Sequence, residues 1–115
     1  MAMVLVVDDD PGMRQLVRMI LEQSGHVVLS ATNGVEALMV YASYHSRLDV
    51  LVTDVDMPQM GGIELAARIR AMHAPNRIVL MTGSILEKVP EYCTMLSKPF
   101  RPDELIAAVQ GVQQR

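Results

Sequence analysis

The stretch Val50-Leu51-Val52-Thr53-Asp54 decides the fold of this chain. Its first four residues are apolar or β-branched, and a short run of this kind is typical of a strand that is buried on both faces. The run ends on a carboxylate, which would lie where the strand stops, at the carboxyl edge of a sheet. Ligands of open α/β sheets bind at this edge. Asp54 is therefore the first candidate for a functional residue.

Short apolar runs of the same kind recur along the chain and predict four further strands, at residues 3–7, 27–31, 78–81 and 94–97. Between these runs, apolar residues recur at helical spacing. The buried helix faces predicted in this way are Met13, Leu16, Val17, Ile20 and Leu21, then Val35, Leu38, Met39 and Ala42, then Leu65, Ile69 and Met72, and finally Leu105, Val109 and Val112. Residues 85–89 leave room for only one or two helical turns before Pro90.

Strands that alternate with helices predict a parallel sheet with right-handed crossovers and helices on both faces. We therefore predict an α/β fold of five strand–helix pairs with a short or irregular fourth helix. The expected sheet is doubly wound and flavodoxin-like, with strand order 2-1-3-4-5. The chain has 115 residues, the size of one ordinary domain, so we assign residues 1–115 to a single domain.

Composition argues against several classes of protein. The net charge is −3, and no basic patch suggests direct binding to nucleic acid. No apolar run is long enough to insert into a membrane, and the N-terminus lacks the pattern of a signal peptide, so we expect a cytoplasmic protein. Cys93 is the single cysteine, which argues against disulfides and cysteine-based zinc sites. The ten methionines are expected mainly to fill the core, as at Met13, Met39, Met72 and Met81.

Polar side chains follow four of the predicted strands at the same edge of the sheet. Strand one is followed by Asp8 and Asp9, strand three ends on Asp54, and strands four and five are followed by Thr82 and Lys98. Crowded carboxylates resist ionisation unless a cation joins them, and oxygen ligands of this kind suit Mg²⁺ or Mn²⁺. A hydroxyl and an ammonium group across the pocket would hold phosphoryl oxygens, because phosphoryl transfer depends on positioning and charge neutralisation.

Each of these residues alone would more often be an ordinary loop or surface residue. Their joint occurrence, each at the end of a strand, is the argument for a site. Other polar residues have no such placement, and we interpret them as surface, capping or structural residues: His26, His45, Asp49, His73, Glu87, Asp103 and Glu104.

With these residues placed, the chain resembles the receiver domain of two-component response regulators over essentially its whole length. The matching motifs are Val6-Val7-Asp8-Asp9-Asp10, Asp54-Val55-Asp56-Met57-Pro58 with Gly62, Thr82-Gly83, and Lys98-Pro99-Phe100. The combination is highly specific, although no single motif is.

The resemblance implies a role for each acidic residue. Asp54 would be the nucleophile that takes a phosphoryl group from a phosphohistidine. Asp54 and Asp9 would bind Mg²⁺ directly, Asp8 would act through a metal-bound water, and the backbone carbonyl of Asp56 would complete the metal shell.

The resemblance also implies the remaining roles and the partners. Lys98 would pair with the phosphoryl group, Thr82 would move to hydrogen-bond it, and Lys98–Pro99 would be a cis peptide. The donor would be a sensor histidine kinase or a phosphotransfer domain, and the phosphorylated domain would act on an unknown downstream protein. No enzyme activity is expected beyond self-catalysed phosphorylation and slow autodephosphorylation.

The sequence departs from the family pattern at four places. Met95 stands where an aromatic switch residue is usual, and the fifteen residues between Thr82 and Lys98 are fewer than usual. Asp56 places a carboxylate two residues after the acceptor. Arg101 takes the expected N-cap of the last helix, where Ser or Thr would cap better. The shortened region and the Lys98-to-Pro102 ending are also similar to receivers at the C-terminus of hybrid sensor kinases.

Two alternatives remain open at this point. Asp54-Val55-Asp56 also looks like the nucleophile motif of haloacid-dehalogenase-type phosphatases, in which the second Asp is a general acid/base. Those enzymes are usually longer and do not need an Asp pair after the first strand. The other alternative is a degenerate receiver that only binds proteins. The intact site residues argue against it: Asp8, Asp9, Asp54, Thr82 and Lys98.

Overall fold

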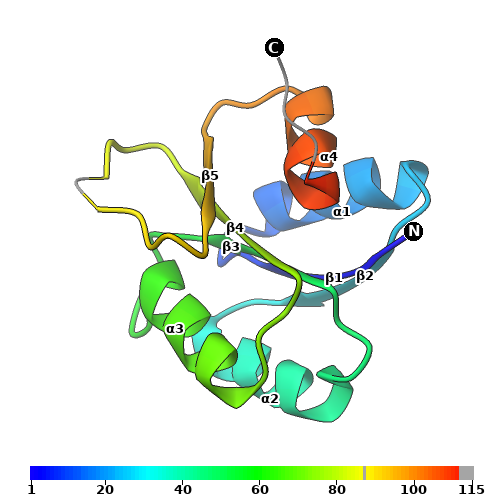
Figure 1. Ribbon diagram of the computed structural model, residues 1–115. Helices are drawn as coiled ribbons and strands as arrows, with labels where there is room; N and C mark the ends of the chain where they lie inside the picture. Colours follow the sequence, from blue (N-terminus) through cyan, green and yellow to red (C-terminus); the bar gives the residue numbers. More distant parts are fainter. Residues whose placement is uncertain (87, 112–115) are drawn as a thin grey trace.

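The computed structural model describes residues 1–86 and 88–111. Five strands and four helices follow one another along the chain (Figure 1). Their order is β1 (Met3–Val7), α1 (Pro11–Gln23), β2 (Val27–Ala31), α2 (Gly34–Tyr44), β3 (Val50–Asp54), α3 (Gly62–Met72), β4 (Arg77–Thr82), β5 (Thr94–Ser97) and α4 (Pro102–Gln110). None of the described helices is long and apolar enough to cross a membrane.

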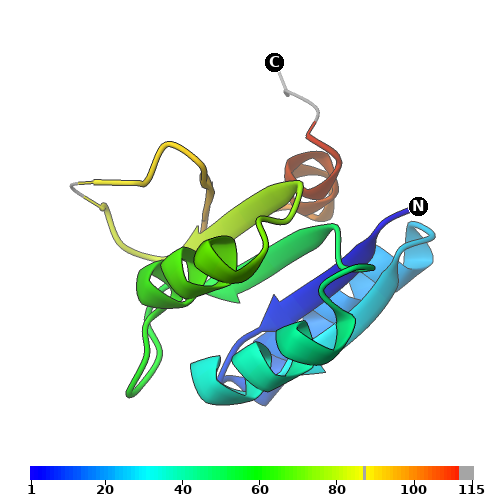
Figure 2. The same cartoon turned by 60° about the horizontal axis from the view of Figure 1, so that its bottom comes forward.

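The strands form one parallel sheet in the order β2-β1-β3-β4-β5, which confirms the predicted topology. Helices α1 and α4 cover one face of the sheet, and α2 and α3 cover the other (Figures 1 and 2). The arrowheads of β1, β3 and β4 point to the same side in Figure 2, so their carboxyl ends share one edge. The strand order changes direction between β1 and β3, and that is where a doubly wound sheet binds its ligands.

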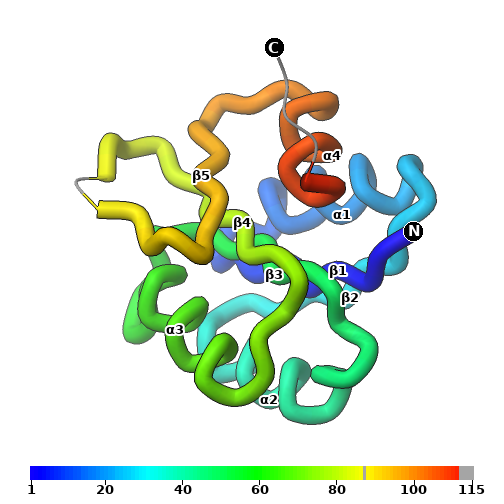
Figure 3. The backbone as a smooth tube through the Cα atoms, in the orientation of Figure 1, coloured from blue at the N-terminus to red at the C-terminus, as the bar shows by residue number. Residues whose placement is uncertain are grey.

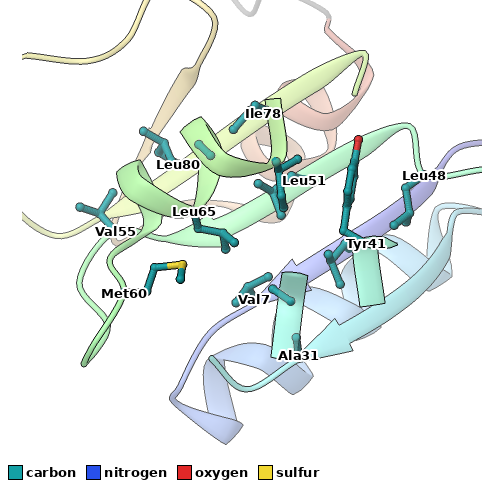
Figure 4. Packing of buried hydrophobic residues seen from close by; sticks show 14 residues of the cluster. Val7, Ala31, Tyr41, Leu48, Leu51, Val55, Met60, Leu65, Ile78 and Leu80 are labelled. Carbon is teal, nitrogen blue, oxygen red and sulfur yellow. The ribbon is translucent and has the colours of Figure 1, made fainter. Parts of the chain in front are cut away.

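Alternate residues of each central strand point into two separate cores. Leu5 and Leu51 face α2 and α3, whereas Val4 and Val52 face α1 and α4, and all four are fully buried. Figure 4 shows the first core, where Leu65 of α3 lies over the sheet. Burial on both faces explains why these strands are continuously apolar in the sequence.

Of the predicted buried face of α2, only Leu38 packs against the core, while Val35, Met39 and Ala42 are exposed. Val35 and Met39 are 53% and 68% exposed, while Ala37 and Tyr41 are buried. The helix is apolar on nearly every side, so spacing alone did not identify the face that packs. Tyr41 decides it, because its ring fills the space over the sheet (Figure 4) and its hydroxyl donates a hydrogen bond to the carbonyl of His73.

The expected role of the methionines is corrected at two positions. Met81 is fully buried and Met13 packs against the core of α1 and α4, as predicted. Met39 and Met72 are 68% and 50% exposed and fill no core. Leu16, also predicted to be buried, is 42% exposed at the margin of its helix face.

The connection between β4 and β5 forms no helix in its described residues, 83–86 and 88–93. The expected fourth segment is therefore irregular rather than a short helix, and Glu87 lies outside the described residues. Figure 3 shows this connection as a wide loop beside α3. Four partly buried side chains pack it against the core of α2 and α3: Leu86, Val89, Tyr92 and Cys93. The Arg70 guanidinium lies 4.3 Å from the centre of the Tyr92 ring, and burial raises the pKa of the Cys93 thiol to about 11.

The last helix begins without Ser or Thr at its N-cap. Instead, the Glu104 carboxylate accepts the backbone N–H of Arg101 at 2.8 Å, and the Arg101 guanidinium pairs with Asp103 at 3.1 Å. Glu104 thus supplies one half of a capping box, whereas the Arg101 side chain has no acceptor atom and caps no N–H of the first turn. Leu105 and Val109 are buried as predicted, and Val112 lies outside the described residues.

Candidate functional site

The strand register brings the predicted site residues to one edge of the sheet. Val7 pairs with Thr53, so Asp8 follows β1 beside Asp54 at the end of β3. Thr82 pairs with Ser97, so Lys98 follows β5 beside the end of β4. The site therefore results from where four neighbouring strands stop.

Three carboxylates form the acidic side of the site. One oxygen each from Asp8, Asp9 and Asp54 can be chosen so that all three lie within 4.8 Å of one another. Asp8 is fully buried and Asp54 is 7% exposed, while Asp9 is open to solvent. Within residues 1–86 and 88–111, no other group of three or more His, Cys, Asp or Glu side chains meets this spacing.

Within this cluster, burial makes ionisation of the Asp8 carboxyl unfavourable. Its Oδ1 accepts the backbone N–H of Asp10 at 2.9 Å, but its buried Oδ2 has no hydrogen-bond partner. Burial raises the pKa of the Asp8 carboxyl, although the Asp10 N–H and the Lys98 ammonium oppose the rise. A buried carboxylate oxygen without a hydrogen-bond partner, next to two further carboxylates, fits a hard divalent cation such as Mg²⁺ or Mn²⁺.

Lys98 forms the cationic side of the site. Its Nζ lies 3.2 Å from Oδ1 of Asp54 and 3.8 Å from Oδ2 of Asp8, and its side chain is 24% exposed. The peptide bond between Lys98 and Pro99 is cis, as the family resemblance predicted. The ammonium group thus contacts two of the three acids and remains open to an anionic group from solvent.

Thr82 lies at the predicted strand end, but its hydroxyl is hydrogen-bonded to Ser84 and not to Asp54 or Lys98. Its hydroxyl oxygen accepts the backbone N–H of Ser84 at 3.0 Å, and the hydroxyl lies 3.3 Å from the Ser84 carbonyl, to which it donates. Thr82 is 1% exposed. To donate a hydrogen bond to a group on Asp54, the hydroxyl would have to give up the Ser84 carbonyl.

The loop after β3 approaches Asp54 closely because of Gly62. The Gly62 N–H donates to the carbonyl of Val55 at 2.9 Å, and a Cβ at this position would lie 2.2 Å from the carbonyl oxygen of Asp54. Any larger residue would push α3 away from the end of β3. Asp56, in the same loop, is exposed.

Sequence reasoning missed Arg14, the fourth residue of α1. Its Nη1 donates a hydrogen bond to the backbone carbonyl of Asp8 at 2.8 Å. The available signal was its position, one turn into a helix that begins directly after the aspartates. Met95, which stands where the family usually has an aromatic residue, is 42% exposed on the edge strand β5.

The histidines lie away from this edge, and an apolar groove beside α2 contains none of the predicted site residues. His26 is buried and its Nδ1 accepts the backbone N–H of Ala2 at 3.0 Å, which is a structural role. An open groove of about 630 Å³ beside α2 is lined by Val35 and Met39, and its one acid, Glu36, accepts the backbone N–H of Thr32. The titratable groups that could act together are those around Asp54.

Comparison with known proteins identifies the family. The model of the response regulator receiver domain matches residues 4–110. Response regulator MprA of Mycobacterium ulcerans is 36% identical over 118 residues, which cover 97% of this chain and 50% of that protein. This chain thus spans about half the length of that relative.

Solved structures agree with the family match. Chemotaxis protein CheY4 of Vibrio cholerae is 33% identical with a TM-score of 0.84, over 98% of this chain and 99% of that chain. A response regulator receiver domain protein from Clostridium thermocellum is 25% identical with a TM-score of 0.90, over 96% and 93% of the two chains. Neither the haloacid-dehalogenase alternative nor the degenerate receiver is favoured by these matches. The chain belongs to the receiver domain family of response regulators.

Proposed function

We propose that Asp54 is the phosphoryl acceptor of this receiver domain. The observation that carries the proposal is the position of its carboxylate, whose Oδ1 lies 3.2 Å from Lys98 Nζ and which clusters with the carboxylates of Asp8 and Asp9. A phosphoryl group on Asp54 would meet a cationic group on one side and a cation-binding acid pair on the other. That arrangement supplies the charge neutralisation that phosphoryl transfer requires.

The donor would be the phosphohistidine of a sensor histidine kinase or a phosphotransfer domain. A carboxylate oxygen of Asp54 attacks the phosphorus atom, a P–O bond forms, and the P–N bond to histidine breaks. The electron pair of the broken bond stays with the imidazole nitrogen. Lys98 then pairs with the phosphoryl oxygens, and the domain itself catalyses both this transfer and the slow hydrolysis of the aspartyl phosphate, in which water takes the phosphoryl group and the Asp54 carboxylate is released.

Mg²⁺, or Mn²⁺ in its place, would be held by Asp9 and Asp54, by Asp8 through a water molecule, and by the carbonyl of Asp56. The bound cation would neutralise charge that develops on the phosphoryl oxygens. Support for this comes from the oxygen-only donor set and from Oδ2 of Asp8, which is buried without a hydrogen-bond partner.

Signal output would begin at Thr82. If its hydroxyl turns toward the phosphoryl group, it releases the Ser84 carbonyl and frees the start of the β4–β5 connection. The readout would be a changed surface for a downstream protein rather than direct contact with nucleic acid. We also propose that residues 1–115 form one receiver domain and that the exchange takes place in the cytoplasm, where kinases draw phosphate from ATP.

The test is phosphorylation by a small donor. Incubation of the chain with acetyl phosphate and Mg²⁺ should add one phosphoryl group by intact mass, and Asp54→Asn should remain unlabelled. Labelling that survives Asp54→Asn, or no labelling of the wild type, would overturn the assignment. Sustained turnover of a phosphomonoester that is lost in Asp56→Asn would instead favour phosphatase chemistry.

A further inference from the structure

Two arginines lie one turn apart on α1 and make different contacts. Arg18 is 47% exposed and pairs with Glu22 at 3.4 Å on the helix surface. Arg14 is only partly exposed and reaches back six residues, where its Nη1 donates to the carbonyl of Asp8 at 2.8 Å. Residues four apart lie on the same helix face, so the two arginines differ only in the group that each side chain contacts.

The carbonyl that Arg14 binds belongs to the peptide that joins Asp8 to Asp9. Because a peptide unit is planar, a hydrogen bond to its oxygen fixes the direction from which the Asp9 backbone leaves. The same turn is held by two further bonds, from the Asp8 N–H to the Ala31 carbonyl at 3.3 Å and from the Asp10 N–H to Oδ1 of Asp8 at 2.9 Å. The contact from Arg14 holds the peptide oxygen.

The Asp9 carboxylate depends on this backbone orientation. It is open to solvent and makes no hydrogen bond or ion pair with any residue in 1–86 or 88–111. Nothing on its side chain therefore holds it within 4.8 Å of the oxygens of Asp8 and Asp54. Its place in the cluster follows from the turn on which it stands.

We propose that Arg14 is a positioning residue for cation binding, which it supports by fixing the Asp8–Asp9 peptide. This inference rests on the proposed function, because the cation is the one that would assist phosphorylation of Asp54. Outer contacts that orient metal ligands typically contribute tenfold to a hundredfold to metal affinity. The charge of the guanidinium acts in the opposite sense, since a positive group near the site repels a cation, and the direction of the effect distinguishes the two.

The experiment is a calorimetric titration of the full chain with MgCl₂. Arg14→Met should bind Mg²⁺ about tenfold more weakly than wild type, whereas the matched control Arg18→Met should bind as wild type does. Arg14→Lys keeps a donor and the charge and should restore part of the affinity. The melting temperature of each variant in EDTA checks that it is folded, and labelling by acetyl phosphate should recover in Arg14→Met at high Mg²⁺ concentration. Arg14→Lys, compared with wild type, serves as the test if Arg14→Met does not fold.

Equal or tighter Mg²⁺ binding by Arg14→Met overturns the positioning role, and tighter binding identifies charge repulsion as the dominant effect. If wild type and Arg18→Met both fail to bind Mg²⁺, the proposed function and this inference fall together. If they bind and Arg14→Met matches them, only the inference falls.

Discussion

At the scale of single residues, Asp8 shows how the site opposes the stability of the fold. Burial raises the pKa of its carboxyl, so ionisation is less favourable in the folded chain than in the unfolded chain. In EDTA, the contribution of this group to the free energy of unfolding is therefore greatest below about pH 4 and is lost as the pH rises through the folded-state pKa. A site that needs an ionised, buried carboxylate therefore lowers the free energy of unfolding until a cation binds.

Asp8→Asn should make the cation-free protein more stable. The amide oxygen can still accept the Asp10 N–H, and the buried negative charge is gone. The gain should be small near pH 4 and grow to about 1–2 kcal/mol at pH 7. Urea unfolding in EDTA across this pH range measures it. With saturating Mg²⁺ the order should reverse, and a variant that is less stable at pH 7 in EDTA would mean that the attraction of Lys98 outweighs burial.

Gly62→Ala tests the close approach of α3 to the acceptor. Its methyl carbon would lie 2.2 Å from the Asp54 carbonyl oxygen, so the helix must shift, which should lower the free energy of unfolding by about 2–3 kcal/mol. Chemical denaturation measures the change. Gly83→Ala is the matched control for stability, since a Cβ there meets nothing within 4 Å. Equal stability of both variants would show that the loop yields easily.

The sequence predicts the acids and the lysine of the site because each lies directly after a short apolar run. Strand ends are local signals, and parallel topology brings them together. Arg14 is different. A long side chain on the first turns of a helix can reach solvent, as Arg18 does, or return to the preceding loop, and spacing alone does not separate the two outcomes.

At the scale of elements, α2 shows the limit of periodicity. Its residues Val35 and Met39 have the right spacing for a buried stripe, but Ala37 and Tyr41 pack instead. A helix that is apolar all round offers several candidate faces, and the choice depends on which side chain fits the sheet below. The hydrogen bond from Tyr41 to the end of α3 then links the two helices.

Tyr41→Phe should lower the free energy of unfolding by about 1–2 kcal/mol, because the carbonyl of His73 loses its donor while the ring still fills the core. Tyr44→Phe on the same helix, at a residue that is 39% exposed, is the matched control and should change stability by less than about 0.5 kcal/mol. Thermal unfolding of the pair measures the difference. A similar effect of both substitutions would show that the hydrogen bond adds nothing.

The connection between β4 and β5 is the other element that the sequence did not specify. Pro90 and the short span predicted a short or irregular helix, and the described residues form none. Partly buried side chains replace the missing helix face, and Tyr92 under Arg70 fixes the far end of the loop to α3. Such contacts are set by tertiary packing, which no local pattern encodes.

Tyr92→Ala should loosen this connection. Loss of the ring removes both the contact with Arg70 and part of the apolar cover, at a cost of about 1–2 kcal/mol. Amide hydrogen exchange should become faster in the β4–β5 connection and stay unchanged in β1 and β3. Ile85→Ala, at a side chain that is 97% exposed, should leave exchange as it is. Unchanged exchange in Tyr92→Ala would show that the loop is held by its other contacts.

At the scale of the whole molecule, the parallel sheet separates stability from function. Two cores, one on each face, hold the strands, while the charged groups collect at the carboxyl edge between them. The clustered charges destabilise the cation-free state, because three carboxylates share this edge with one ammonium group that contacts only two of them. Binding of a cation should therefore be visible as stability of the entire domain.

Mg²⁺ should raise the melting temperature of the chain, and EDTA should reverse the rise. At a hundred times the dissociation constant, binding to the folded state alone contributes about 2.7 kcal/mol, which corresponds to a shift of roughly 10 °C for a domain of this size. Asp9→Ala should abolish the shift without lowering the melting temperature in EDTA, since the Asp9 carboxylate is open to solvent and makes no hydrogen bond or ion pair with residues 1–86 or 88–111. Scanning calorimetry with and without Mg²⁺ measures both quantities. If Asp9→Ala kept the full shift, the cation would bind somewhere other than the edge formed by β1 and β3.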